Sequence, residues 1–160
     1  MSKTKTVALS MVLVLLLPLL AGCAGNAYHA ELYDLAVEWI DEEFAKEHPV
    51  RVLGASEEDD PNPKFRTFLV DSQDEYNEIF KDGQPSVDFN TQMLVIYTFS
   101  TEYHRENRIT DLELADGVLR ITYEMEKKYG VGDASMPYQR WFVVKLDKLE
   151  VSSVVFEERK

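Results

Sequence analysis

The sequence has little of what most catalytic and metal sites need. It holds one cysteine and three histidines among 160 residues, and the histidines form no H-x-x-x-H pair. A zinc site is therefore not expected, and no disulfide can form within the chain. The serines lie in no G-x-S-x-G elbow, and no glycine-rich phosphate loop is present. We therefore expect no metal, no cofactor and no enzyme activity.

Basic residues are scarce as well. The chain carries 17 Lys and Arg against 29 Asp and Glu, for a formal net charge of −12 at pH 7. An acidic surface repels phosphate backbones and anionic headgroups, so nucleic-acid binding is not expected. Carboxylates are the one abundant catalytic residue type, and a hydrolase that uses two of them is the remaining enzyme hypothesis.

Long apolar runs are confined to the N-terminus, where the pattern is typical of a bacterial lipoprotein signal. Lys3 and Lys5 precede the apolar residues 7–20, and Leu20-Ala21-Gly22-Cys23 resembles a lipobox. The segment is too short to be a permanent transmembrane helix. By this resemblance, cleavage leaves Cys23 as a lipidated N-terminus. It would anchor the chain in the cell membrane or the outer membrane, with the domain on the extracytoplasmic side.

The chain is predicted to divide into a signal peptide (1–22), a lipidated tether (23–30) and a single domain (31–160). The domain is long enough to bury one apolar core. Residues 55–63 hold four consecutive acids and two prolines, which indicate a loop or a linker within that domain.

Two helices are expected in the domain. Apolar residues recur at three- and four-residue spacing and predict a helix over residues 28–46. They are Leu32, Leu35, Ala36, Trp39, Ile40 and Phe44. Ser72-Gln73-Asp74-Glu75 is a capping box that predicts a second helix, with Tyr76, Ile79 and Phe80 on its buried face.

Six strands are expected, over residues 65–70, 93–99, 110–114, 119–125, 138–146 and 151–156. The segment 93–99 is apolar on both faces and is predicted to be central. Asp116-Gly117 predicts a hairpin, and the last two strands are expected to pair through a turn near Asp147. The predicted fold is α+β: one twisted antiparallel sheet of about six strands packed with two helices, with curling toward a barrel as an alternative.

The connection after the central strand is the candidate binding segment. Residues 101–107 include Tyr103, His104 and Arg105, a mixture of aromatic and charged groups in a position where binding residues often lie. Arg140 and Trp141 are expected at the same end of the sheet.

The order of these elements suggests a relative. Residues 65–157 resemble the C-terminal domain of the PrcB family, which is named for a subunit of a secreted protease complex. The matching segments are Ser72-x-x-Glu75-Tyr76, Val87–Asn90, Met93–Ile96, Asp116-Gly117, Pro137-Tyr138 and Val143–Leu146. The chain departs from the family at Tyr103-His104-Arg105, where the family tends to have a Gly-Gly-Tyr-like turn. The resemblance implies an accessory, non-catalytic role.

Two function hypotheses of different classes follow. The leading one is a non-enzymatic envelope lipoprotein that binds or scaffolds a secreted or envelope protein. The alternative is a lipoprotein receptor for a small ligand or a cation, which rests on residues 101–107 and on the acidic composition.

Overall fold

The computed structural model describes residues 29–34, 38–81, 83–127, 132 and 134–159, without the side chains of residues 105 and 127. Two helices and seven strands lie in these ranges, so the predicted α+β class is confirmed. In chain order they are β1 (Ala30–Tyr33), α1 (Glu42–Glu47), β2 (Phe65–Val70), α2 (Gln73–Ile79), β3 (Gln92–Thr101), β4 (Arg105–Ala115), β5 (Val118–Lys127), β6 (Tyr138–Asp147) and β7 (Ser153–Glu158).

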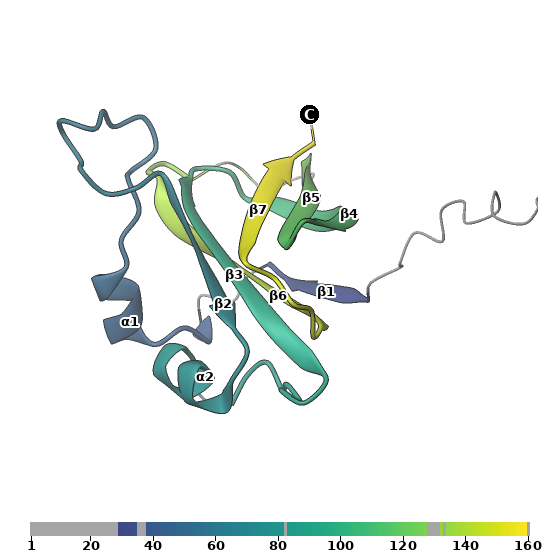
Figure 1. Cartoon of the computed structure of the whole chain (residues 1–160). Helices are drawn as coiled ribbons and strands as arrows, with labels where there is room; N and C mark the ends of the chain where they lie inside the picture. The colour runs from purple at the N-terminus through teal and green to yellow at the C-terminus, as the bar shows by residue number, and fades with distance from the viewer. Residues whose placement is uncertain (1–28, 35–37, 82, 128–131, 133, 160) are drawn as a thin grey trace, which may run out of the picture.

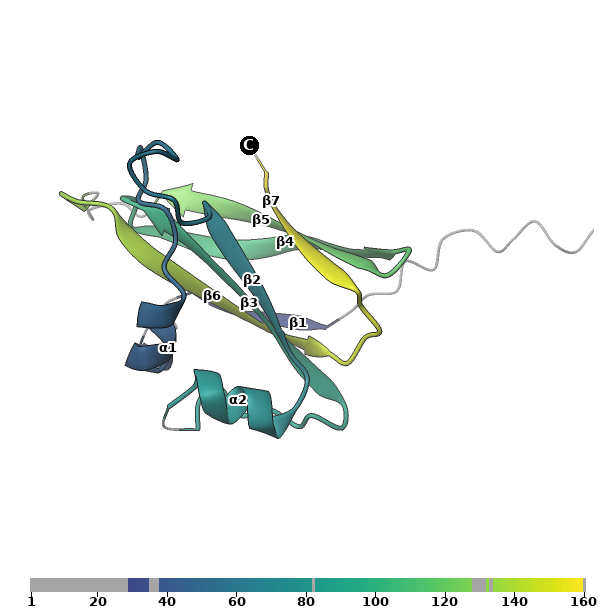
Figure 2. The ribbon, with the colours of Figure 1, turned by 60° about the vertical axis from the view of Figure 1, so that its left-hand side comes forward.

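The elements form three layers. Strands β1, β6, β3 and β2, in that spatial order, make an antiparallel first sheet, and β4, β5 and β7 make a second sheet. Both helices lie on one face of the first sheet, and the second sheet packs on its other face (Figures 1 and 2). The first sheet is therefore the middle layer.

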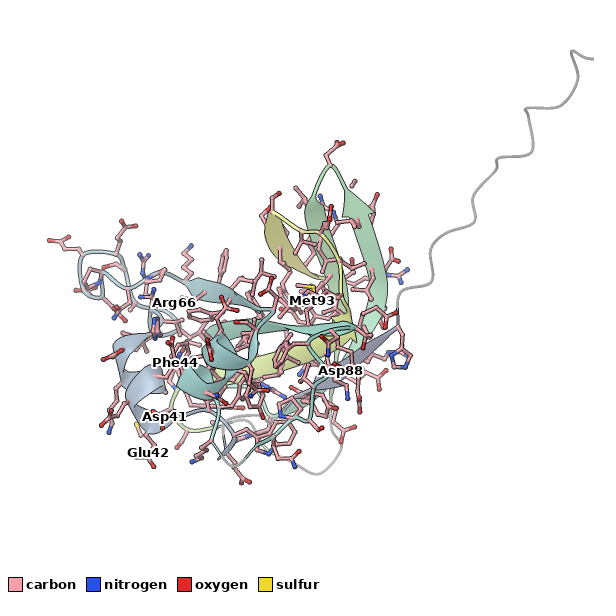
Figure 3. The ribbon with its side chains drawn as sticks, turned by 60° about the horizontal axis from the view of Figure 1, so that its bottom comes forward. Asp41, Glu42, Phe44, Arg66, Asp88 and Met93 are labelled. Carbon is pink, nitrogen blue, oxygen red and sulfur yellow. The ribbon has the colours of Figure 1, made fainter. Side chains whose placement is uncertain are left out.

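Strand β3 explains why the first sheet is covered on both faces. Leu94 and Ile96 point to the helices, whereas Met93, Val95 and Tyr97 point to the second sheet. All five are buried, as the two-faced apolar pattern predicted. Removing one such aliphatic side chain from water contributes about 1.5–3 kcal/mol to folding. Figure 3 shows Met93 toward the second sheet and Phe44 of α1 on the helix side.

Helix α2 begins where the capping box predicted. The hydroxyl of Ser72 accepts a hydrogen bond from the amide of Glu75, and the carboxylate of Glu75 accepts one from the amide of Asp71. Tyr76 and Ile79 are buried against the first sheet, as expected. The cap satisfies amides that would otherwise lack partners at the first turn.

The predicted helix over residues 28–46 is wrong. Residues Ala30–Tyr33 form β1, which pairs with the edge of β6, and α1 begins only after Asp41. The carboxylate of Asp41 caps α1 by accepting hydrogen bonds from the amides of Glu43 and Phe44. Pairing with β6 is a long-range interaction, and it overrides the helical spacing of the apolar residues.

The strands also divide differently from the prediction. They form two sheets instead of one of six strands, and across the described ranges these sheets do not close into a barrel. The hairpin at Asp116-Gly117 is confirmed, with φ of 52° and 77°. However, β7 does not pair with β6. The carbonyl of Gly117 accepts hydrogen bonds from the amides of Ser152 and Ser153, which directs β7 along β5 in parallel.

Phe142 of β6 gives a test of the packing between the sheets, because it is fully buried against Tyr97 and Tyr123. We expect Phe142→Ala to lower the free energy of unfolding by about 3–5 kcal/mol, measured by urea unfolding with tryptophan fluorescence. Val155→Ala, at a position that is 38% exposed, is the control and should change stability by only about 0.5 kcal/mol. Equal effects of the two substitutions would contradict this packing.

Candidate functional site

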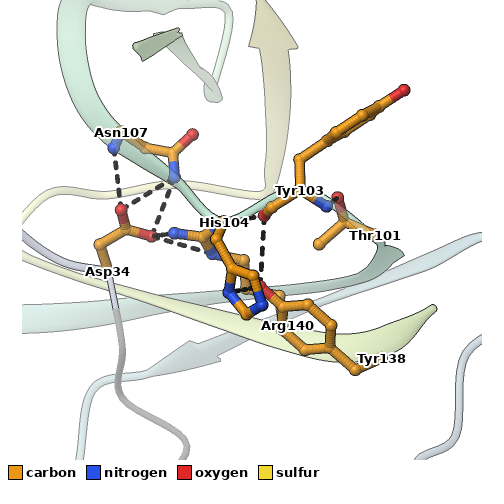
Figure 4. Close-up of polar contacts among 7 residues, drawn as sticks. All are labelled: Asp34, Thr101, Tyr103, His104, Asn107, Tyr138 and Arg140. Atoms are coloured by element: carbon orange, nitrogen blue, oxygen red, sulfur yellow. Dashed lines mark hydrogen bonds and ion pairs between the residues drawn. The ribbon is translucent and has the colours of Figure 1, made fainter. Parts of the chain in front are cut away.

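The candidate site lies at one end of the first sheet. Strand β3 ends at Thr101 and β4 begins at Arg105, so the connection is shorter than the predicted segment 101–107. Thr101 pairs with Tyr138, which brings the start of β6 beside this connection. Figure 4 shows Tyr103, His104 and Arg140 together there, as the sequence predicted.

Arg140 is the centre of this group and is buried, with 3% of its surface exposed. Its Nη2 and Nε atoms donate to Oδ1 of Asp34 at 2.6 and 3.1 Å, and Nη1 donates to the carbonyl of Tyr103 at 3.0 Å. The guanidinium also lies 5.5 Å from the ring centre of Phe142. A buried charge is stable only when it is paired and hydrogen-bonded, and Arg140 meets both conditions.

Asp34 connects the two sheets. Its Oδ2 accepts hydrogen bonds from the backbone amide of Asn107 at 2.8 Å and from Nδ2 of Asn107 at 2.8 Å. Asn107 belongs to β4 of the second sheet, whereas Arg140 belongs to β6 of the first. We name Asp34, Asn107 and Arg140 the polar bridge. The sequence reasoning missed Asp34, because it placed this segment in a helix.

His104 and Tyr138 form the outer part of the site. Their rings stack at 5.3 Å between centres, and the Tyr138 hydroxyl donates to the carbonyl of Tyr103 at 3.2 Å. His104 is exposed to solvent. The hydroxyl of Thr101 accepts a hydrogen bond from the amide of Tyr103 at 3.1 Å, which fixes the connection further. Because hydrogen bonds fix the backbone beside it, the exposed imidazole of His104 is positioned to contact another molecule.

One predicted site residue, Trp141, falls elsewhere. Trp141 is only 2% exposed and packs on the helix side, near Phe44 and Phe68. Adjacent strand residues point to opposite faces, so Trp141 cannot share the surroundings of Arg140. Its prediction as a binding residue is therefore wrong, and Trp141 belongs to the core. Arg105 starts β4 opposite Lys127, but its side chain lies outside the described part of the structure.

The acidic segment 55–63 is a loop organised around Asp60. Its carboxylate accepts hydrogen bonds from the amide of Val52 at 2.8 Å and from that of Asn62 at 3.1 Å. These bonds hold the pKa of Asp60 below its ordinary value. Among the residues that the structure describes, no group of three or more His, Cys, Asp or Glu could hold a metal ion.

Two cavities lie at opposite ends of the first sheet. One, of about 780 Å³, is bordered by Leu69, Asp71, Met93 and Lys148. The other, of about 340 Å³, is bordered by residues 51–55, Lys64 and Ser100. Neither is lined by Tyr103, His104 or Arg140. The predicted binding residues therefore surround a structural bridge and not one of these cavities.

Comparisons of the chain with known protein families, with curated proteins and with solved structures give no match. Function is therefore inferred from the residues and their geometry alone. Over the described ranges, no helix is long and apolar enough to span a bilayer. Cys23 and the signal segment lie outside those ranges, and lipidation at Cys23 stays a prediction from the sequence.

The polar bridge predicts strong energetic coupling between its charges. We expect Asp34→Leu to destabilise the protein by about 3 kcal/mol, since it leaves the buried guanidinium of Arg140 unpaired. The double variant Asp34→Leu with Arg140→Met should lose less stability than the two single variants added together, because no buried charge remains. Urea unfolding of all four proteins measures this, and strictly additive losses would contradict the bridge.

Proposed function

We propose that the protein is a non-enzymatic envelope lipoprotein whose domain binds a secreted or envelope protein as an accessory or scaffold subunit. The observation that carries the proposal is the position of Cys23, directly after Leu20-Ala21-Gly22 and a short apolar segment with a positive start. Short motifs within residues 65–157 resemble the C-terminal domain of the PrcB family in the sequence, and this resemblance implies the same accessory role.

The distance between the anchor and the fold supports a function beside the membrane. Strand β1 begins at Ala30, seven residues after Cys23, and is held by pairing with β6. Whatever its conformation, a segment of that length spans at most about 25 Å. A lipid on Cys23 would therefore keep the domain close to the bilayer. Confinement raises the effective concentration of the domain toward other envelope proteins, which favours binding to them.

The chemistry of the described site supports binding more than catalysis. The charged groups of the polar bridge contact one another and the Tyr103 carbonyl, so their hydrogen bonds are used to join the sheets. His104, stacked on Tyr138, is exposed beside the bridge. Groups of this kind suit a contact with another protein.

In-cell crosslinking of the full-length chain tests the proposal. We expect the wild-type protein to fractionate with membranes, to incorporate a labelled fatty acid and to retain one dominant protein partner. Cys23→Ser should lose the label and leave the membrane fraction, because a thioether-linked lipid needs the thiol. Ala24→Ser is the matched control and should keep both. An unlabelled wild-type chain, or one that retains no protein, would contradict the proposal.

The cavity of about 780 Å³ favours a second candidate, a small-ligand receptor. Its volume lies in the usual range for ligand sites, and it combines Leu69 and Met93 with Asp71 and the ammonium of Lys148. If the cavity binds a ligand, a metabolite panel will raise the melting temperature of the protein, and Glu150→Trp, at an exposed position on the border of the cavity, will reduce the shift. A flat response across the panel, calcium included, would remove this candidate.

A further inference from the structure

Large apolar side chains are exposed at the end of the first sheet that holds Thr101 and Tyr138. Val52, Leu53 and Phe65 are 50%, 44% and 57% exposed. We name these three residues the distal patch. The amide of Leu53 donates to the hydroxyl of Ser100 at 3.0 Å, and Phe65 pairs with Phe99. Ser100 and Phe99 are neighbours on opposite faces of β3, so the loop meets the end of the sheet on the helix side and Phe65 lies there on the side of the second sheet. The cavity of about 340 Å³ is bordered by Val52, Leu53 and Lys64, whereas Phe65 lies outside it.

The loop that carries Val52 and Leu53 is held by hydrogen bonds among its own residues. The amide and the Nε atom of Arg51 donate to the carbonyls of Pro63 and Asn62 at 2.7 and 3.0 Å. The amide of Val52 donates to the carboxylate of Asp60 at 2.8 Å. Together with the bond from Leu53 to Ser100, these bonds fix the backbone of residues 51–53 while the side chains of Val52 and Leu53 face solvent. A surface ordered before binding loses less conformational entropy when it binds.

Acidic side chains outnumber basic ones around the patch, where Lys64 is exposed and Arg51 pairs with Glu57. Glu57, Glu58 and Asp59 are exposed in the same loop, and the Glu57 side chain is 84% exposed although it pairs with Arg51. An apolar centre with a charged rim is the usual anatomy of a protein contact surface. Because this rim is negative, a complementary partner would be positive around its own apolar centre.

The patch also lies far from the start of the domain. Ala30 pairs with Leu146 near one end of the first sheet, whereas Phe65 and Thr101 lie at the other (Figure 1). The two ends are separated by the length of β3, which for ten residues is about 30 Å. With the chain anchored before Ala30, the patch lies at the end opposite the tether.

We propose that the distal patch is the contact surface for the protein partner, and that the partner presents an apolar side chain flanked by Lys or Arg. This inference rests on the proposed function and names the surface that performs it. A second copy of this chain is a less favourable partner, since its acidic rim would repel the acidic rim of the first. Binding of the patch to a bilayer is the least favourable case, because anionic headgroups repel the rim and the tether starts at the other end of the domain.

Site-specific photo-crosslinking of the full-length lipoprotein in cells tests this assignment. A photoreactive side chain is placed at Leu53, and at Val155 of β7 as the exposed apolar control. We expect an adduct with another protein from position 53 only. Its mapped peptide should hold an apolar residue beside Lys or Arg. Phe65→Asp should weaken this adduct about tenfold, as for the loss of an interface anchor. Val155→Asp should leave it unchanged.

Val52→Asp is a second variant in the loop, outside any strand, and it guards against misfolding of Phe65→Asp at the start of β2. It should weaken the position-53 adduct to a similar extent. An adduct from position 155 alone would overturn the distal patch and leave the proposed function intact. An adduct with a second copy, with lipid, or with an acidic peptide would also overturn it. No adduct with another protein at either position would overturn both.

Discussion

The first sheet must be covered on both faces, and the other elements are arranged to meet this need. Its two central strands, β3 and β6, carry buried apolar side chains in succession, such as Val95 and Ile96, or Val143 and Val144. Neither face can be left to water without losing the main stabilising contribution to the fold. The helices cover one face and the second sheet covers the other. This explains why the described part of the chain, with its two short helices, forms three layers.

The space between the two sheets changes in character along its length. Aliphatic side chains fill it near Met93, and aromatic ones fill it around Tyr97 and Tyr123, whose hydroxyls share a hydrogen bond. Burial raises the pKa of both hydroxyls, so each stays protonated over the ordinary range of pH. Near Arg140, the apolar contacts between the two sheets are replaced by the hydrogen bonds of the polar bridge. A directional bridge fixes how the two sheets meet at an edge where apolar contact alone would permit sliding.

What could be predicted from the sequence was local. The strand 65–70, the Ser72 cap and the Asp116-Gly117 turn each depend on neighbouring residues, and the structure confirms them. Strand β1, the parallel pairing of β7 with β5 and the role of Asp34 depend on residues far away in the chain. Leu32 fits a helical spacing as well as it fits a strand, and only the edge of β6 decides between them. Trp141 was misassigned for a related reason, since the face that a strand residue occupies depends on the whole sheet.

Two loops at the same end of the first sheet show why a mixture of polar residues is a poor guide to a binding surface. The sequence predicted that the connection through Tyr103 and His104 binds a partner. In the structure, the backbone carbonyl of Tyr103 accepts hydrogen bonds from Arg140 and Tyr138, so it stabilises the fold. Residues 55–63 were expected to form a loop or a linker, yet Asp60 of that segment accepts a hydrogen bond from the amide of Val52 and helps to hold the exposed residues Val52 and Leu53 in place. Polar groups that contact one another are already satisfied and gain little from a partner. Exposed apolar groups on a fixed backbone still lose free energy when a partner covers them, which is why the second loop is the better candidate for the contact surface.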